Sequence, residues 1–396
     1  MKAMKEKIFL AGAVRTPIGK FGGGLAGTTA VELGTHAGRA ALKRAGVLPD
    51  QVDQAILGHA RQAGCGPNPA RQVSVACGMP VERPAFTVNQ ACLSGMQTIF
   101  AAIRAVHVGE AEVVLAGGME SMSRVPYLME SRWGHKMGHQ TLTDAMYRDG
   151  FLDPLSGKIM GETAETLAER YEITRREQDE YASMSQQRCE RARSTGVFRD
   201  EIEPIEISER RGPRLVDTDE HPRDGITPEA LGRLPPVFNK EGTVTAGNSS
   251  GITDGAAALL VLTENAAKRL GVAPMARVVG YRVVGVDPAI MGIGPVPAVR
   301  DLTQSTGVAL DEIDLVELNE AFAAQVLAVV RDLKLDLERM NVNGGAIALG
   351  HPIGCSGARI VVTLLHEMIR RKNRRGLATL CVSGGLGGAM ILERSA

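Results

Sequence analysis

The feature that most constrains this chain is a motif that occurs twice, once early and once late. Cys92-Leu-Ser-Gly95 is followed by a helical pattern, an apolar strand pattern and the pair Gly117-Gly118. Gly354-Cys-Ser-Gly357 is followed by the same features, ending at Gly384-Gly385. The period is far too long for a solenoid. Two similar halves are therefore predicted, with their strand ends and helix N-termini around one shared cleft, where open α/β sheets bind ligands.

The length of 396 residues predicts more than one packed unit, because single cores stop growing near ~250–300 residues. Apolar runs alternate with helical spacing, which predicts α/β architecture with a mostly parallel sheet. We expect strands at Ile8–Val14, Val52–Gly58, Ala85–Val88, Val113–Ala116, Ala257–Leu262, Ala276–Val286, Asp314–Leu318 and Leu377–Cys381. We expect helices after the capping boxes Thr29/Glu32 and Thr174/Glu177, over Met96–Val106, from Glu320 and over Ile360–Ile369.

Irregular, proline-containing sequence between the two patterned regions predicts an inserted domain. The expected division is residues 1–121 with 252–272 as the N-terminal half, 122–251 as the insertion and 273–396 as the C-terminal half.

Composition excludes several classes of protein. Forty-five basic residues balance forty-five acidic ones, which argues against partnership with nucleic acid or an anionic membrane. No apolar run approaches the ~20 residues of a transmembrane helix, and Arg15-Thr-Pro17 interrupts the first apolar run too early for a signal peptide. The six cysteines show no CxxC spacing, which argues against disulfides and structural zinc. A cytoplasmic enzyme is expected.

Cys92 is the first candidate for chemistry. It lies between a predicted strand and the first turn of a long helix, where the helix dipole and unpaired N–H groups would lower the pKa of a thiol. From this position alone a buried structural cysteine is the alternative. The small neighbours Ala91, Ser94 and Gly95 allow a substrate to approach, which favours a nucleophile.

Two glycine-rich segments supply the other candidates. His351 precedes a proline, which favours an extended backbone from which the ring can reach the cleft as a base, although a lone histidine is more often structural. Cys381 ends a predicted strand on a glycine turn that can present N–H groups to an oxyanion. Dinucleotide binding is excluded there, because Met390 breaks the GxGxxG register and a strand rather than a helix follows.

Four segments together resemble the thiolase family over essentially the whole chain: Ala116-Gly-Gly-Met-Glu-Ser121, Val244-Thr-Ala-Gly-Asn-Ser-Ser-Gly251, Asn319-Glu-Ala-Phe-Ala323 and Gly350-His-Pro-Ile-Gly354. The resemblance implies two βαβαβαββ halves in a five-layered α-β-α-β-α arrangement, with an inserted loop domain that covers the coenzyme A site. It also implies reversible thiolysis of 3-oxoacyl-CoA, or Claisen condensation of acetyl-CoA, through a cysteine acyl-enzyme in ping-pong order.

The resemblance assigns roles residue by residue. Cys92 matches the nucleophile, His351 its activating base, and Cys381 the acid/base for the acetyl group. Asn319 matches the residue that holds an oxyanion-hole water, with His351 as the other donor. The backbone N–H groups of Cys92 and Ser383 match the second oxyanion hole.

Further positions match binding residues of the family. The coenzyme A or acyl contacts are Arg223, Phe238, Ala246, Ser250, Met160 and Phe322. Acetyl-CoA, acyl-CoA and CoA are the implied partners, with coenzyme A as a substrate and no cofactor or metal. A role in fatty acid metabolism and a homo-oligomer, a tetramer in preference to a dimer, are also implied.

Two departures from the family pattern bear on specificity. Ile159 stands where acetoacetyl-specific relatives have histidine, which favours longer acyl chains, whereas the bulky Phe151 fills space. Ser383 stands where a glycine is usual, so N–H donation there requires a backbone conformation that serine tolerates.

Two other functions are compatible with this fold. A decarboxylative ketoacyl-synthase-type enzyme would pair its cysteine with two histidines, and Cys381 argues against it. A non-catalytic acyl-CoA or sterol carrier would not need Cys92, Asn319, His351 and Cys381 together.

Overall fold

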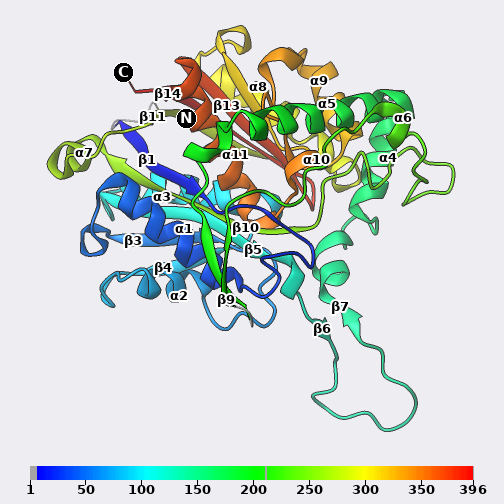
Figure 1. Cartoon of the computed structure of the whole chain (residues 1–396), viewed down its shortest axis with the longest axis horizontal. Coiled ribbons are helices and arrows are strands. Elements are labelled where there is room, and N and C mark those ends of the chain that lie inside the picture. The colour runs from blue at the N-terminus through cyan, green and yellow to red at the C-terminus, as the bar shows by residue number, and fades with distance from the viewer. Residues whose placement is uncertain (1–6, 210–211, 396) are drawn as a thin grey trace.

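A ten-stranded sheet runs through the computed structural model, which describes residues 7–209 and 212–395 (Figure 1). The strands in spatial order are β12 (Leu315–Leu318), β13 (Arg375–Val382), β14 (Leu386–Arg394), β11 (Ala276–Gly285), β1 (Ile8–Arg15), β10 (Thr253–Thr263), β5 (Val113–Ser121), β3 (Gln54–Gly58) and β4 (Ala85–Val88), and β2 (Gly19–Lys20) pairs with β10.

The two halves of this sheet have the same connectivity, which confirms the predicted repeat. In the N-terminal half β3 is parallel to β5, β5 is antiparallel to β10, and β10 is antiparallel to β1. In the C-terminal half β12, β13, β14 and β11 repeat these relationships. The halves join where Phe9 and Leu10 of β1 pair with β11.

The prediction of a mostly parallel sheet was wrong. Only β3–β4, β3–β5 and β12–β13 are parallel among the strand pairs of the described part of this sheet. Parallel neighbours need a crossover of about a dozen residues or more. The turn 383–385 between β13 and β14 is too short for that, so these two strands form an antiparallel hairpin.

Helices form three layers around the two half-sheets. Val113 and Leu115 of β5 pack in a core with the outer helices α1 and α2, whereas Val114 and Ala116 face the central helices α3 and α11, because neighbouring strand residues point to opposite faces. Helices α8 and α9 cover the outer face of the C-terminal half. This is the predicted five-layered arrangement. The helices are α1 (Ala30–Ala45), α2 (Pro69–Ala76), α3 (Ser94–His107), α7 (Glu264–Leu270), α8 (Pro295–Thr306), α9 (Ala323–Leu333), α10 (Ala346–Leu349) and α11 (Ile353–Arg371).

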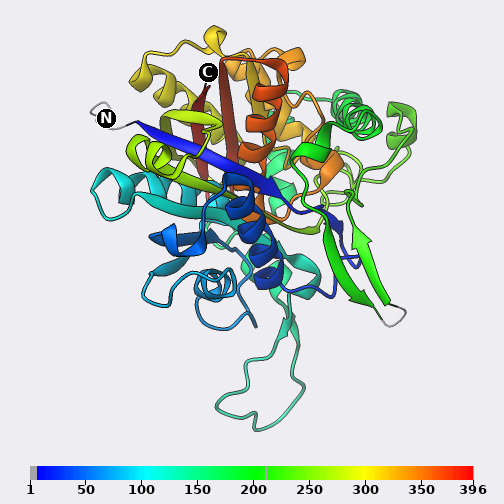
Figure 2. The same cartoon turned by 60° about the vertical axis from the view of Figure 1, so that its left-hand side comes forward.

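The segment between β5 and β10 is less regular. Its elements are β6 (Tyr127–Leu128), β7 (Thr143–Asp144), α4 (Met160–Arg170), α5 (Arg175–Ser194), β8 (Ile205–Glu209), β9 (Gly212–Val216) and α6 (Pro228–Leu231). Figures 1 and 2 show the loop between β6 and β7 projecting away from the body. Helix α5 is tied to the C-terminal half, because Tyr181 and Ser185 donate hydrogen bonds of 2.7 and 2.8 Å to the buried Glu320. The domain boundaries 122 and 251 remain a prediction.

The capping boxes placed two helix starts correctly. Both predicted capping boxes, at Thr29 and Thr174, open helices. The helix expected from Glu320 instead begins at Ala323, because Phe322 is extended and bridges to Ser249. Among the described residues, no helix combines the length and apolar character needed to cross a membrane.

Candidate active site

Cys92 lies in a short 3-10 turn, Ala91–Leu93, which directly precedes α3. Ala91 has a positive φ of 45°, a conformation that is costly for a residue with a side chain. Asn89 stabilises it: its Oδ1 accepts the Ala91 N–H at 3.0 Å and its Nδ2 donates to the carbonyl of Ala60 at 3.1 Å. This turn fixes Cys92 at the N-terminus of α3.

Two glycines bring the helices that carry the repeated motif together. A side chain at Gly95 of α3 would collide with the backbone nitrogen of Ala358, and one at Gly357 of α11 would collide with that of Met96. The helices can therefore approach this closely only with glycine at these positions. As the repeat predicted, the N-termini of α3 and α11 meet at one place.

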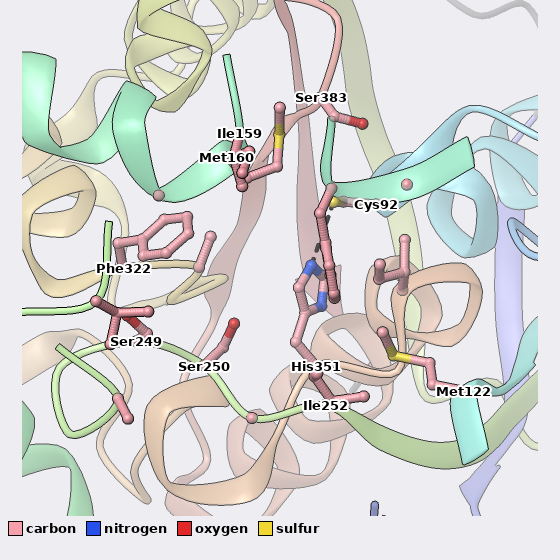
Figure 3. A pocket seen from close by; sticks show the side chains of 18 of the residues that line it. Cys92, Met122, Ile159, Met160, Ser249, Ser250, Ile252, Phe322, His351 and Ser383 are labelled. Atoms are coloured by element: carbon pink, nitrogen blue, oxygen red, sulfur yellow. Dashed lines mark hydrogen bonds between the residues drawn. The ribbon is translucent and has the colours of Figure 1, made fainter. Parts of the chain in front are cut away.

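His351 lies two residues before the start of α11 and points its ring at Cys92 (Figure 3). Its Nε2 lies 3.2 Å from Cys92 Sγ, and its Nδ1 lies 2.5 Å from Ser356 Oγ. The Ser356 hydroxyl donates to the carbonyl of Pro352 at 3.0 Å, so its oxygen accepts the Nδ1 proton. We therefore assign the proton to Nδ1, which leaves the Nε2 lone pair facing the thiol.

Burial controls the charge of this pair. It lowers the pKa of His351 from 6.5 to about 3, with Arg359 and Arg61 acting in the same direction. Burial also raises the pKa of Cys92, although Arg61 and the N–H groups of Ser383 and Cys92 act to lower it. The predicted net lowering of the Cys92 pKa was therefore wrong, because desolvation outweighs the backbone donors. Without substrate the pair is a neutral thiol and a neutral imidazole.

Cys381 is the second-to-last residue of β13, which is followed by the turn that leads into β14. Burial raises its pKa, and charge on Cys92 raises it further, so its thiol keeps its proton near neutral pH. The left-handed conformations in the turn fall on Gly384 and Gly385, with φ of 84° and 81°. Ser383 is not among the residues with positive φ, so serine is tolerated at this position.

A cavity of about 380 Å³ contains these groups: Cys92, His351, Cys381 and Ser383 line it. All the predicted binding residues line it too, namely Met160, Arg223, Phe238, Ala246, Ser250 and Phe322. Figure 3 shows Met160 and Phe322 on one side of the Cys92–His351 pair and Met122 on the other. The sequence thus identified the reactive groups of this cavity and all of the predicted binding residues in its wall.

Asn319 is the predicted site residue that is absent from the cavity lining. It is fully buried, at the end of β12, and its carboxamide has no hydrogen-bond partner among the described residues. Its backbone N–H donates to the carbonyl of Thr379 at 3.0 Å.

Sequence reasoning did not identify Arg61 and His221, which also line the cavity. Arg61 follows the strand that ends at Gly58, and this position was a usable signal because ligands bind at such strand ends. His221 lies in the irregular insertion, where no pattern marked it. Its Nδ1 contacts the carbonyl of Ala348 at 2.7 Å, and burial lowers its pKa.

Comparison with known proteins identifies the family. The thiolase N-terminal domain matches residues 8–265 and the thiolase C-terminal domain matches residues 272–394. An acetyl-CoA acetyltransferase of Pseudomonas aeruginosa is 52% identical, with 98% of this chain and all of that protein covered. This chain belongs to the thiolase family.

Solved structures give the same result. The acetyl-CoA acetyltransferase of Bacillus anthracis has a TM-score of 0.97 at 48% identity, with both chains covered completely. Human mitochondrial 3-ketoacyl-CoA thiolase in complex with CoA has a TM-score of 0.96 at 45% identity, with 99% of each chain covered. Neither a decarboxylative condensing enzyme nor a non-catalytic carrier is favoured by these relatives.

Proposed function

We propose that this chain is an acyltransferase that catalyses reversible thiolysis of 3-oxoacyl-CoA, and the reverse Claisen condensation, through an acyl-enzyme on Cys92. The 3.2 Å contact between His351 Nε2 and Cys92 Sγ is the observation that supports the proposal most directly. Acetyltransferase and 3-ketoacyl-CoA thiolase names among the relatives support the same reaction.

In the first step Cys92 loses its proton to His351 Nε2 as its sulfur adds to the C3 carbonyl of the substrate. The C2–C3 bond then breaks, leaving the acyl group on Cys92. Cys381 gives its proton to C2 of the departing acetyl-CoA. The raised pKa of the Cys381 thiol supports this role, because the proton donor is present at neutral pH. The proton that His351 took from Cys92 then passes to the Cys381 thiolate, which leaves the imidazole neutral again.

In the second step coenzyme A enters and its thiol loses a proton to His351, which returns that proton to Cys92 at the end of the step. Its sulfur adds to the thioester carbon on Cys92, and the acyl-CoA leaves. The N–H groups of Cys92 and Ser383 would stabilise the oxyanion of this step, and both already act on the Cys92 sulfur. Asn319 is proposed to hold a water for the other oxyanion, and its buried unpaired carboxamide supports this.

Coenzyme A is a substrate in this proposal and no resident cofactor takes part. Arg223, Phe238, Ala246 and Ser250 would contact its nucleotide, pantetheine and thioester regions, and Met160 with Phe322 would line the acyl site. Their shared cavity with Cys92 supports these assignments. Residues 122–251 would act as the loop domain that covers this site.

The remaining proposals concern assembly and context. A homotetramer is favoured over a dimer, and the exposed apolar side chains of Trp133 and Met137 on the projecting loop support self-association. A cytoplasmic location and a role in fatty acid metabolism complete the proposal. Light scattering of the purified protein tests the assembly.

The activity is tested by thiolysis of acetoacetyl-CoA, which is monitored through the loss of the magnesium-enolate absorbance of this substrate. Wild type should consume it in the presence of CoA, and Cys92→Ala should not. Cys77→Ala is the matched control, because this buried thiol lies between α1 and α2, outside the cavity. An active Cys92→Ala variant, or a wild type that needs a malonyl thioester, would refute the proposal.

A further inference from the structure

Arg61 is a buried cation in the cavity wall whose guanidinium has no partner among the described residues. The residue is 7% exposed and lines the cavity together with Cys92. Its guanidinium forms no hydrogen bond or ion pair with the part of the chain that the structure describes, and its Nε is completely enclosed.

Among the described residues, the other buried arginines face carboxylates. Arg15 contacts Glu201 at 2.6 Å and Asp219 at 2.7 Å. Arg359 lies 3.4 Å from Glu317. Burying a charge without a partner is costly, so proteins rarely retain one without a use for it. Arg61 is the exception here, and it faces the space that a substrate enters.

The carboxylate of Glu120, which interacts with the charge of Arg61, is already occupied by other donors. Glu120 accepts the backbone N–H groups of Ala60 and Arg61 at 3.1 Å and that of Gly354 at 2.8 Å. It also lies 3.1 Å from Nε2 of His59. The carboxylate of Glu120 thus holds the backbone of Arg61 in place and leaves the guanidinium free.

His59 interacts with the same Glu120 carboxylate. Burial acts to lower the pKa of His59, but its contacts with Cys65 and Glu120 raise it to about 9, so His59 is a cation at neutral pH. The charge of Glu120 is therefore shared between His59 and Arg61. Of the described residues that line the cavity, none carries a carboxylate.

The surroundings of Arg61 indicate which part of a substrate it would meet. A side chain at Gly150 would collide with the guanidinium, so the charged group lies directly against the backbone of the inserted segment. Ala60, Met122 and Phe151 pack in one apolar cluster with Cys92. An acyl chain attached to Cys92 that lies along this cluster would contact apolar side chains near the sulfur. The far end of the acyl chain would then come within reach of the Arg61 guanidinium.

We propose that Arg61 is a specificity-determining residue that binds a carboxylate at the far end of the acyl chain. The preferred substrates are then 3-oxoacyl-CoA thioesters whose acyl chain ends in a carboxylate. This inference rests on the proposed thiolase reaction and adds the chemical class of its substrate.

The reaction is unchanged and balances as before. The Cys92 sulfur bonds to C3, the C2–C3 bond breaks, and the Cys381 proton goes to C2 of acetyl-CoA. Coenzyme A then takes the acyl group from Cys92 and returns a proton through His351. The product is an ω-carboxyacyl-CoA that is two carbons shorter, and its carboxylate remains ionised throughout.

The test compares kcat/KM for 3-oxoadipyl-CoA and 3-oxohexanoyl-CoA, which have the same chain length and differ in the terminal carboxylate. Wild type should show a kcat/KM about tenfold or more higher for the substrate with the carboxylate, because a hydrogen bond to a charged group strengthens binding by about that factor. Arg61→Leu should abolish or invert the preference through KM, and Arg61→Lys should keep part of it. Arg83→Leu, which removes a partly exposed arginine paired with Asp53 at 3.1 Å, should keep all of it.

Two outcomes would overturn the proposal. One is a wild type that shows no preference for the carboxylate. The other is an Arg61→Leu variant that loses both substrates equally through kcat, which would make Arg61 an electrostatic aid to the Cys92 thiolate. Acetylation of Cys92 by acetyl-CoA is measured in every variant, so failure of the thiolase reaction itself is recognised separately.

Discussion

Ser356 Oγ lies 2.5 Å from His351 Nδ1 and, at the same time, donates its proton to the carbonyl of Pro352. The hydroxyl can therefore only accept from the ring, which fixes the tautomer that presents a basic Nε2 to Cys92. Ser356 touches neither substrate nor Cys92 in the proposed reaction and is a positioning residue. It stands in the second copy of the repeated motif, in the place that Ser94 has in the first.

Ser356→Ala should lower kcat by about ten- to hundredfold, a part of the ~10²–10⁴-fold effect of a general base, and leave KM nearly unchanged. The ring would lose its orientation, while the cavity wall would stay intact. Steady-state thiolysis of acetoacetyl-CoA measures both constants. Ser74→Ala is the matched control, since Ser74 is buried, donates to the carbonyl of Arg71 at 2.9 Å and is not part of the cavity lining. A normal kcat in Ser356→Ala would show that Ser356 does not position the His351 ring.

Cys381→Ala should separate acylation from carbon–carbon chemistry. Transfer of an acetyl group from acetyl-CoA to Cys92 needs no proton transfer at C2, so it should persist in this variant. Condensation and thiolysis should fall by at least about 10²-fold, because the acid/base for C2 is lost. Mass spectrometry of the quenched enzyme measures the first property and the thiolysis assay the second. If a folded Cys381→Ala protein fails to become acetylated, Cys381 is not the group that acts on C2.

Ile159 and Phe151 both line the cavity and have opposite expected effects on chain length. Apolar lining at Ile159 should let 3-oxohexanoyl-CoA and 3-oxooctanoyl-CoA react, since each buried methylene contributes about 0.8 kcal/mol. Ile159→His should shift kcat/KM toward acetoacetyl-CoA, by about tenfold within the ~1–3 kcal/mol of pocket discrimination. If wild type disfavours both longer substrates by more than about a hundredfold in kcat/KM, Phe151 rather than Ile159 limits the length of the acyl chain. Phe151→Leu should then raise kcat/KM for the longer substrates.

His351 should make the protein less stable in acid. Its pKa is lowered from 6.5 to about 3 in the folded state, so the unfolded chain binds more protons between these values. The contribution of His351 to stability is therefore present above pH 6.5 and is lost as the pH falls toward 3. The free energy of unfolding of wild type should rise with pH more steeply than that of His351→Asn, by up to about 1.4 kcal/mol per pH unit.

Urea unfolding at several pH values between 4 and 6 measures this difference in slope. His139→Asn is the control, because His139 is exposed and its loss should leave the slope unchanged. Parallel curves for wild type and His351→Asn would show that His351 takes up no extra proton on unfolding.

Much of the fold and site could be predicted from the sequence because the relevant signals are local. Periodicity and capping boxes located β4, α1 and α5, and the repeated motif indicated that Cys92 and His351 would lie near each other. These signals depend on neighbouring residues, which a sequence displays directly.

What could not be predicted depends on three-dimensional burial and on pairing at a distance. The raised pKa of Cys92 results from desolvation, which no helix-terminus pattern encodes. Arg61 was missed because its lack of a partner becomes apparent only when Glu120, far away in sequence, is seen to bond to other donors. The antiparallel pairs of the sheet followed from turn lengths that apolar periodicity does not fix.

The most direct test of the account is to identify the thiol that carries the acyl group. The protein is incubated with acetyl-CoA without an acceptor, quenched in acid and mapped by mass spectrometry. A parallel sample is labelled briefly with limiting iodoacetamide. Cys92 and Cys65 are partly accessible while the other four cysteines are buried, so Cys65 is an internal control. We predict the acetyl group on Cys92 and protection of Cys92 by prior acetylation. We also predict first alkylation at Cys92 despite its raised pKa, because His351 Nε2 lies 3.2 Å from its sulfur and can take the proton during attack. An acetyl group or first label on Cys65, with Cys92 unmodified in folded protein, would contradict the account.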